Sequence, residues 1–261
     1  MTTGIQHKVA VVTGGASGIG RATALAFARE GAKVAVVTGR SMAAAEETVR
    51  QIRDLGGEAV FVQCDVTDEA QVAAMVAETV ATFGRLDIAF NNAGVGPDGV
   101  TIPFGPLTGV TEAHWDCVVD TNLKGVFLCM KHELKQMREQ RSGVIVNTAS
   151  TAGLQAKGGF GAYSPSKAGV ISLSKVAAIE NKDLGIRVNV VCPGPTKGTG
   201  MMERMLSACS SAAPGRGPGA PPDEILGDPH DIARTVIWLC SHEASYIDGN
   251  VLSVDGGLDI A

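Results

Sequence analysis

Residues 8–20 read Lys-Val-Ala-Val-Val-Thr-Gly-Gly-Ala-Ser-Gly-Ile-Gly. An apolar run of strand length is followed at once by a glycine-rich turn, which leads into a helical pattern carried by apolar residues between 22 and 27. Glycines let a backbone approach a pyrophosphate closely, and free amides at a helix N-terminus attract its negative charge. The glycines alone would fit an ordinary turn. Their place between a strand and a helix, with a second strand at residues 33–38, favours a nucleotide-binding βαβ unit.

The rest of the chain alternates strands and helices. We expect further strands at residues 58–64, 87–90, 144–150, 186–192 and 251–254, and helices at residues 41–55, 69–83, 111–138, from 163 onward and 228–242. Such alternation is typical of an α/β fold in which a parallel sheet is covered on both faces. We therefore predict one domain over residues 1–261, built on a doubly wound seven-stranded parallel sheet that binds ligands at the carboxyl ends of its strands.

Composition narrows the class of partner. With 261 residues, 45% hydrophobic content and 4% aromatic content, the chain can bury a large aliphatic core. Its 22 basic and 27 acidic residues are spread along its length, which argues against a nucleic-acid or anionic-membrane partner and favours a small-molecule substrate. No signal-peptide pattern precedes the first strand and no apolar run reaches membrane-spanning length, so we expect a soluble cytoplasmic protein.

Six cysteines and five histidines are dispersed without a C-x-x-C pair or the spacing of metal ligands. We therefore expect reduced thiols, no disulfide framework and no metal site.

Tyr163 and Lys167 lie four residues apart at the start of a predicted helix, so they share one helix face. A phenol titrates near ~10, and a neighbouring cation favours the phenolate. Lowering the pKa by ~2 to 3 pH units would take roughly 3 to 4 kcal/mol, which a partly desolvated lysine and a bound cationic nicotinamide can supply together. Ser150, at the end of the preceding strand, is placed to bind the same substrate oxygen. An isolated pair of this spacing is more often an incidental surface feature.

The end of the second strand discriminates between coenzymes, because an acid there binds a ribose 2′-hydroxyl and an arginine accommodates a 2′-phosphate. This chain has Thr38-Gly39-Arg40-Ser41 at this point, and the first acidic residue after the strand is Glu46. A charge-assisted bond from Arg40 to the phosphate would be worth about 1.5 to 3 kcal/mol, or roughly 10- to 100-fold in preference. We favour NADP over NAD; the alternative is that Arg40 only begins the next helix.

Three polar positions have two interpretations each. Asp65, just past the third strand, would either bind an adenine amino group or cap the helix that begins near Asp68. Asn92-Ala93-Gly94 would either admit a ribose or form a plain turn. Asn122, inside an apolar helix, needs partners and would either satisfy backbone groups or hold a water in a proton path.

Residues 194–227 are expected to form a lid, because periodicity fades after a strand's carboxyl end apart from a short helical pattern at residues 201–206. An apolar pocket is indicated by Met201, Met202, Leu154 and Phe160. The helix at 111–138 and the helix that begins at Tyr163 are apolar on more than one face, so we expect each to pack on the sheet and on a partner subunit.

Six motifs occur in order: Thr13–Gly20, Asn91–Gly94, Asn122, Ser150, Tyr163 with Lys167, and Pro193-Gly194. In this combination the chain resembles the classical short-chain dehydrogenase/reductase family over essentially its whole length. The resemblance implies a single-domain Rossmann fold, an NAD(P) coenzyme, hydride transfer to or from a carbonyl or secondary alcohol, and a homotetramer.

The resemblance also implies roles for individual residues. Tyr163 would be the general acid/base, Lys167 would lower its pKa and hold the nicotinamide ribose, Ser150 would orient the substrate oxygen and Asn122 would hold a relay water. The implied coenzyme contacts are Gly14, Ser17, Gly18, Ile19, Gly20, Arg40, Asp65, Val66, Asn92, Ala93, Gly94, Tyr163, Lys167, Pro193, Gly194 and Thr196. Two positions depart from the family pattern. Ser17 stands where many NADP-dependent members carry a basic residue, and Pro195 to Thr199 shifts the usual threonine, so Thr199 competes with Thr196.

These features predict reversible hydride transfer between a nicotinamide coenzyme and a ketone or secondary alcohol. NADP(H) is the favoured coenzyme and NAD the alternative. A 3-oxoacyl thioester is one candidate substrate. A non-catalytic nucleotide sensor of the same fold is the competing hypothesis. A serine hydrolase is excluded because the chain has no G-x-S-x-G motif.

Overall fold

The computed structural model describes residues 3–99, 101–211 and 226–258, with the backbone alone described for 208–211. Its centre is a seven-stranded sheet of order β3-β2-β1-β4-β5-β6-β7, and every adjacent pair of strands is parallel. The strands are β1 (Val9–Thr13), β2 (Lys33–Thr38), β3 (Ala59–Gln63), β4 (Ile88–Asn91), β5 (Gly143–Thr148), β6 (Ile186–Pro193) and β7 (Val251–Val254). This confirms the predicted doubly wound sheet. The strand order reverses between β1 and β4, which is where such sheets bind ligands.

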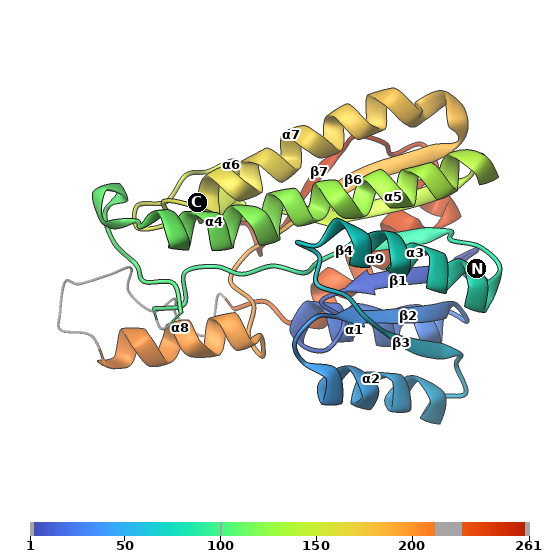
Figure 1. Ribbon diagram of the computed structural model, residues 1–261, viewed down its shortest axis with the longest axis horizontal. Helices are drawn as coiled ribbons and strands as arrows, with labels where there is room; N and C mark the ends of the chain where they lie inside the picture. The colour runs from blue at the N-terminus through green and yellow to red at the C-terminus, as the bar shows by residue number, and fades with distance from the viewer. Residues whose placement is uncertain (1–2, 100, 212–225, 259–261) are drawn as a thin grey trace.

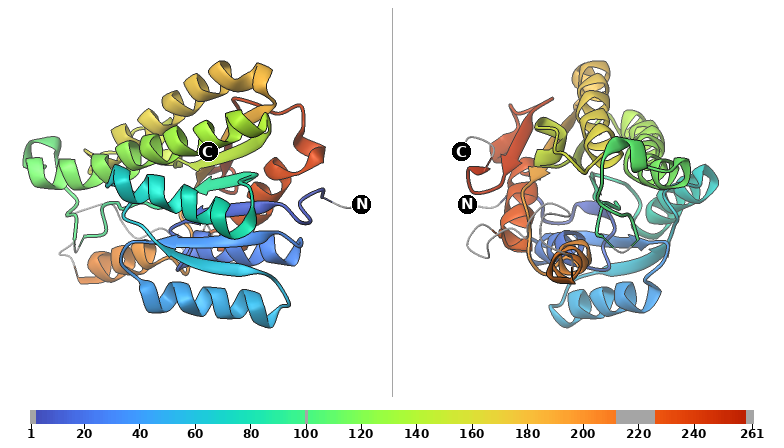
Figure 2. Two further views of the ribbon diagram at one scale, coloured as in Figure 1. Left: turned by 45° about the vertical axis from the view of Figure 1, so that its right-hand side comes forward. Right: turned by 90° about the vertical axis from the view of Figure 1, so that its left-hand side faces the viewer.

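Helices cover both faces of the sheet (Figures 1 and 2). One apolar core joins the sheet to α3 (Glu69–Phe83), α5 (Gly125–Gln140) and α7 (Tyr163–Asn181). The other joins it to α1 (Gly18–Arg29), α2 (Met42–Asp54) and α9 (Pro229–Cys240). Successive residues of β1 alternate between the two cores, as the two-residue period of a strand requires. Both faces are therefore buried, in agreement with the almost continuously apolar strands.

The predicted helix at residues 111–138 is not one regular helix. It consists of α4 (Glu112–Val119), a π-helical segment η2 (Asp120–Lys124) and α5, which together run alongside α7 (Figure 1). Thr111 caps α4, because its hydroxyl accepts a hydrogen bond from the His114 amide. The predicted helical span is confirmed, and the structure adds a π-helical turn within it, in which the backbone hydrogen bonds join residues five apart.

Two segments expected to be irregular contain helices. A short helix, α6 (Thr151–Leu154), occupies part of the predicted loop between Ser150 and Tyr163. In the lid, α8 (Gly200–Ser211) continues past the predicted 201–206 and stands apart from the two helical layers (Figure 1). The remainder of the lid prediction, residues 212–225, lies outside the described residues.

Short 3₁₀ turns complete the description: η1 (Leu107–Gly109), η3 (Lys182–Leu184) and η5 (His242–Ala244).

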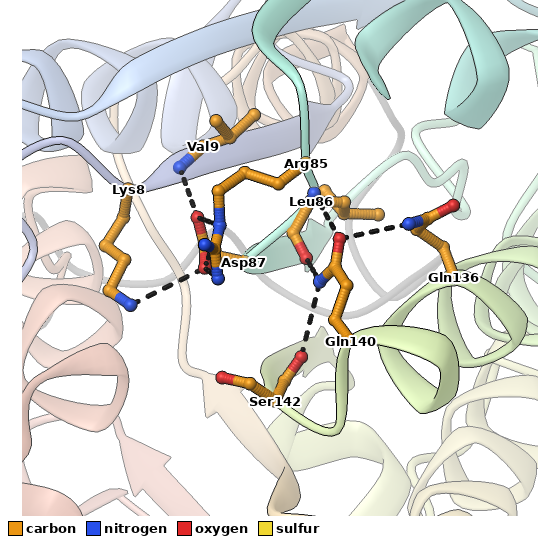
Figure 3. Close-up of polar contacts among 8 residues, drawn as sticks. All are labelled: Lys8, Val9, Arg85, Leu86, Asp87, Gln136, Gln140 and Ser142. Carbon is orange, nitrogen blue, oxygen red and sulfur yellow. Dashed lines mark hydrogen bonds and ion pairs between the residues drawn. The ribbon is translucent and has the colours of Figure 1, made fainter. Parts of the chain in front are cut away.

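A polar cluster lies at the amino ends of the central strands (Figure 3). Asp87 is 3% exposed, and its carboxylate accepts hydrogen bonds from the Val9 amide and the Arg85 guanidinium and faces Lys8 at 3.5 Å. Beside it, the Gln140 side chain accepts from the Leu86 amide and donates to the Leu86 carbonyl. These contacts satisfy backbone groups that the ends of β1 and β4 would otherwise leave unpaired.

A second polar cluster is buried between the sheet and its helices. The Asn91 side chain donates to Glu133 Oε2 at 2.9 Å and to Asn147 Oδ1 at 3.0 Å, and Asn147 donates to Ser174 Oγ at 2.9 Å. Glu133 is fully buried, and this burial raises the pKa of its carboxyl to about 7. The cluster ties β4 and β5 to α5 and α7, the elements that lead into the ligand-binding edge.

Large apolar side chains remain exposed on the helices predicted to contact partner subunits. Trp115 and Phe127, on α4 and α5, are 39% and 45% exposed, and Ile179 on α7 is 70% exposed. Among the described residues, no helix combines the length and hydropathy needed to cross a membrane.

Candidate active site

The glycine turn between β1 and α1 leaves no room for side chains. Gly14 and Gly18 have φ values of 66° and 50°, a region in which side chains are strained. A Cβ at Gly20 would lie 2.1 Å from the Gly14 carbonyl oxygen. Ser17 precedes α1 with extended backbone, and its side chain does not cap the helix. The first amides of α1 are thus available to an anion, as the sequence predicted.

The end of β4 is tied to the end of β1. Thr13 Oγ1 accepts hydrogen bonds from the Asn92 amide at 2.9 Å and from the Ala93 amide at 3.1 Å, and the Asn92 side chain donates to the Thr13 carbonyl. Sequence reasoning missed this role of Thr13, although the residue stands where the strand meets the glycine turn. Gly94 follows, and a Cβ there would be 3.2 Å from Asn122 Oδ1.

Asn122 lies in the π-helical segment and is completely buried. Its Oδ1 accepts from the Val95 amide at 2.8 Å, while its Nδ2 donates to the Val95 carbonyl at 2.7 Å and to Ser166 Oγ at 3.1 Å. The Asn122 side chain therefore satisfies backbone groups, which is one of its two predicted roles. This contact fixes the chain just after β4 against the start of α7.

Ser150 and Tyr163 line the same cavity, and the Ser150 side chain acts to lower the pKa of the Tyr163 phenol. Ser150 lies two residues past β5 and caps α6, where its hydroxyl accepts from the Ala152 amide. Tyr163 is the first residue of α7. The predicted meeting of these two hydroxyl groups is therefore present.

Lys167 lies one turn into α7 and is 4% exposed. Its Nζ donates to the Thr148 carbonyl at 2.8 Å and lies 5.8 Å from the centre of the Tyr163 ring. Burial lowers the pKa of Lys167 to about 8. Burial also raises the pKa of Tyr163, and the Ser150 hydrogen bond offsets only part of that effect. The expected lowering of the phenol pKa is thus absent in the protein alone, because the lysine nitrogen is directed at a backbone carbonyl and the phenol is desolvated.

Ser150, Tyr163 and Lys167 line one cavity of about 360 Å³. Its walls include most of the predicted contacts: Gly14, Ser17, Gly18, Ile19, Asn92, Ala93, Gly94, Ser150, Tyr163, Lys167, Pro193, Gly194 and Thr196. Thr148, which sequence reasoning missed, also lines it; it lies two residues before Ser150, a spacing that places both on one side of an extended chain. Phe160, Met201 and Met202 line the cavity as predicted, whereas Leu154 does not and is 44% exposed.

Thr196 and Thr199 both line this cavity, so it does not separate the two candidates. Thr196 Oγ1 donates to the Gly194 carbonyl, and Thr199 Oγ1 donates to the Thr196 carbonyl. Arg204, one turn further on, donates from Nε to Asp98 Oδ2 at 2.6 Å. This ion pair joins α8, whose Arg204 lines the cavity, to the loop after β4.

The remaining predicted contacts lie outside the cavity. Arg40 follows β2 and is exposed, with no ion pair in the described structure. Asp65 accepts from the amide and hydroxyl of Thr67, while Asp68 caps α3, so the capping interpretation of Asp65 was wrong. Val66 is 7% exposed and packs in the core.

The cavity fits a dinucleotide coenzyme. Gly14 and Gly18 line it next to the start of α1, where backbone amides can bind a pyrophosphate, and Ser150, Tyr163 and Lys167 line it with hydroxyl and amine groups. Within the described residues, no group of three His, Cys, Asp or Glu side chains is placed to hold a metal ion.

Comparisons with known proteins agree with this geometry. A family model described as enoyl-(acyl carrier protein) reductase matches residues 14–259. The 3-oxoacyl-[acyl-carrier-protein] reductase of Staphylococcus aureus (strain Mu50) is 41% identical over 251 residues, covering 96% of this chain and 98% of the relative.

Levodione reductase of Leifsonia aquatica is 38% identical over 266 residues, covering 100% of this chain and 97% of the relative. A crystal structure of levodione reductase superposes with a TM-score of 0.88, covering 98% of this chain and 99% of that one. A structure of NAD+-bound xylitol dehydrogenase, 32% identical, superposes with a TM-score of 0.87 over 97% and 99% of the two chains.

The family match spans nearly the whole chain, and the named relatives are reductases or dehydrogenases. Together with the sheet order and the cavity, this shows that the chain belongs to the classical short-chain dehydrogenase/reductase family and is an NAD(P)-dependent oxidoreductase acting on C=O and CH–OH groups.

Proposed function

We propose that this protein reduces a ketone with a preference for NADPH, and that Tyr163 donates the proton to the ketone oxygen. The observation that carries the proposal is that Ser150, Tyr163 and Lys167 line the same cavity as the glycine turn, with Ser150 acting on the Tyr163 phenol through its side chain. Two hydroxyl groups that converge in this way hold a substrate oxygen between an orienting group and a proton donor. In the reverse direction Tyr163 accepts the proton.

A bound nicotinamide coenzyme would supply the hydride. The turn Gly14 to Gly20 would hold its pyrophosphate, and Asn92, Ala93 and Gly94 would admit the nearer ribose. Asp65 and Val66 are assigned to the adenine end, and Pro193, Gly194 and Thr196 to the carboxamide end. The preference for NADPH rests on Arg40, an exposed cation just past the end of β2, and on the lack of an acidic residue between Thr38 and Glu46 in the sequence. Xylitol dehydrogenase, whose structure contains NAD+, shows that a relative of this fold accepts the unphosphorylated coenzyme.

Lys167 influences the protonation of Tyr163 through its charge, because its Nζ lies 5.8 Å from the centre of the Tyr163 ring. A pKa of about 8 allows the lysine to be either charged or neutral near neutral pH. When charged, it favours the phenolate that remains after proton donation; when neutral, it accepts a proton in turn. We assign the relay water to the region beside Asn122, whose side chain binds the Val95 backbone next to Gly94.

We also propose a cytoplasmic homotetramer in which α4, α5 and α7 pack on partner subunits. The exposed side chains of Trp115, Phe127 and Ile179 support this, because each is a large apolar side chain that burial against a partner would remove from water. The segment 194–227 is assigned as the lid of the single domain. A 3-oxoacyl thioester is one candidate substrate, in line with the name of the Staphylococcus aureus relative.

Tyr163→Phe tests the central assignment. The variant keeps the ring and removes the hydroxyl, so we expect kcat for ketone reduction to fall by about 1000-fold, since positioned proton donors typically contribute 10²- to 10⁴-fold. NADPH binding, measured by fluorescence titration, should remain within about threefold of the wild-type value. A variant with wild-type kcat would refute the role of Tyr163. A wild-type protein that bound NADPH and reduced no carbonyl compound would point to nucleotide sensing.

A further inference from the structure

A second cavity, of about 190 Å³, adjoins Tyr163 and is separate from the coenzyme cavity. It lies between the loop after β4 and the segment before α7. These two segments are joined by a backbone bridge between Gly105 and Phe160. The lining residues are Pro97, Ile102, Pro103, Phe104, Gly105, Pro106, Gly109, Val110, His114, Val118, Gly159, Phe160, Gly161, Ala162 and Tyr163.

The two cavities share three walls. Pro97, Phe160 and Tyr163 line both. The Phe160 ring lies between the others, with its centre 6.0 Å from that of Tyr163 and 5.8 Å from that of Phe104. The second cavity therefore adjoins the coenzyme cavity where the Phe160 and Tyr163 side chains form a wall of both.

The walls of the second cavity are mostly apolar. Among its described lining residues, His114 and Tyr163 have polar side chains, and the others are aliphatic, aromatic, proline or glycine. No lysine, arginine, aspartate or glutamate is among them, so this surface does not recognise a phosphate or carboxylate. A cavity of ~150 Å³ with apolar walls holds a benzene molecule. The volume here therefore suits one six-membered ring or a branched chain of similar size.

We propose that the second cavity is a substrate subsite that binds the larger substituent of the ketone, and that the preferred substrates are uncharged ketones with a single ring or a compact branched group next to the carbonyl. The inference rests on the proposed function, because it places the ketone oxygen at Tyr163. Residues of the loop after β4, which lie outside the six family motifs of the sequence, then determine specificity.

Gly105 offers a way to fill the subsite. It lines the second cavity, its φ is not positive, and a Cβ built there meets no described atom within 4 Å. Its neighbour Pro106 favours extended backbone at residue 105, which a β-branched residue also prefers. Gly105→Val therefore adds volume without straining the turn. Gly158 is the matched control, since it is also open to a Cβ and free of positive φ but lines neither cavity.

The experiment measures kcat/KM for butan-2-one, 3-methylbutan-2-one and cyclohexyl methyl ketone with NADPH. In the wild type and in Gly158→Val we expect kcat/KM to rise with substituent size, by about fourfold for each buried methylene. In Gly105→Val the value for cyclohexyl methyl ketone should fall at least about tenfold, while that for butan-2-one stays within about twofold. Val110→Phe, which fills the subsite from another wall, should give the same pattern. Thermal midpoints of both variants confirm folding.

The possible failures are distinct. If the wild type reduces none of the three ketones, the proposed ketone reduction is refuted, and the proposed preference for uncharged ring-bearing or branched ketones is refuted with it. If the wild type reduces them and Gly105→Val retains the rate for cyclohexyl methyl ketone, the subsite proposal alone is overturned. An equal loss for all three ketones would also overturn it, because that pattern reports damage to the proton-transfer site.

Discussion

Polar side chains at the two ends of the central strands have different surroundings. At the amino ends, Asp87 and Gln140 are paired with neighbouring side chains and backbone groups, and their contacts remain within the protein (Figure 3). At the carboxyl ends, Ser150, Tyr163 and Lys167 converge on a cavity. The first arrangement contributes stability, and the second holds groups in position for a ligand. Substitutions at the two ends should therefore separate stability from activity.

The largest effect is expected at the carboxyl ends. Lys167→Met keeps the length of the side chain and removes its amine, so kcat should fall at least about 100-fold. Stability should change by no more than about 1 kcal/mol, because the loss of one hydrogen bond to Thr148 is balanced by removal of a desolvated amine. Urea unfolding and steady-state kinetics check both statements. Lys175→Met, an exposed position on the same helix, should leave both quantities unchanged.

The buried cluster between the two ends predicts a pH effect on stability. Glu133 keeps its proton in the folded protein up to a pKa of about 7, against an ordinary value of 4.5. Between these values the unfolded chain is ionised and the folded chain is not, so folding loses stability as pH rises from about 4.5 to 7 and is constant above that. The difference amounts to roughly 3 kcal/mol. The nearby thiols Cys64 and Cys129 do not titrate in this range, because burial raises their pKa.

Glu133→Gln tests this effect, because glutamine retains the acceptor for Asn91 and does not ionise. The free energy of unfolding of the variant minus that of the wild type should increase by roughly 3 kcal/mol between pH 4 and pH 8. A difference independent of pH would show that Glu133 titrates alike in the folded and unfolded states.

At the amino ends the expected loss is one of stability. Asp87→Ala leaves the buried Val9 amide without its acceptor, while Arg85 and Lys8, 47% and 36% exposed, return to water. We expect the free energy of unfolding to fall by about 2 kcal/mol and kcat/KM of the folded enzyme to stay within about twofold. Asp87→Asn, which keeps an acceptor, should lose less. A large loss of kcat/KM in folded Asp87→Ala would contradict the separation of the two ends.

The smallest effect concerns coenzyme choice at the end of β2. Arg40→Asp should lower the ratio of kcat/KM for NADPH to that for NADH by about tenfold or more, because the carboxylate repels a 2′-phosphate and binds a 2′-hydroxyl. Arg50→Asp makes the same change of charge on the next helix and should leave the ratio unchanged. Equal or better rates of the wild type with NADH would remove Arg40 from the site.

The sequence was sufficient for the sheet, the coenzyme turn and the Ser150, Tyr163 and Lys167 constellation. These features depend on local pattern: apolar runs of strand length, glycines where side chains do not fit, and a four-residue spacing on one helix face. Only the tertiary structure showed that Lys167 donates to Thr148, that Asn122 interrupts its helix and holds Val95, and that a second cavity adjoins Tyr163. Each of these depends on contacts between segments far apart in the chain and on burial, which a local pattern does not encode.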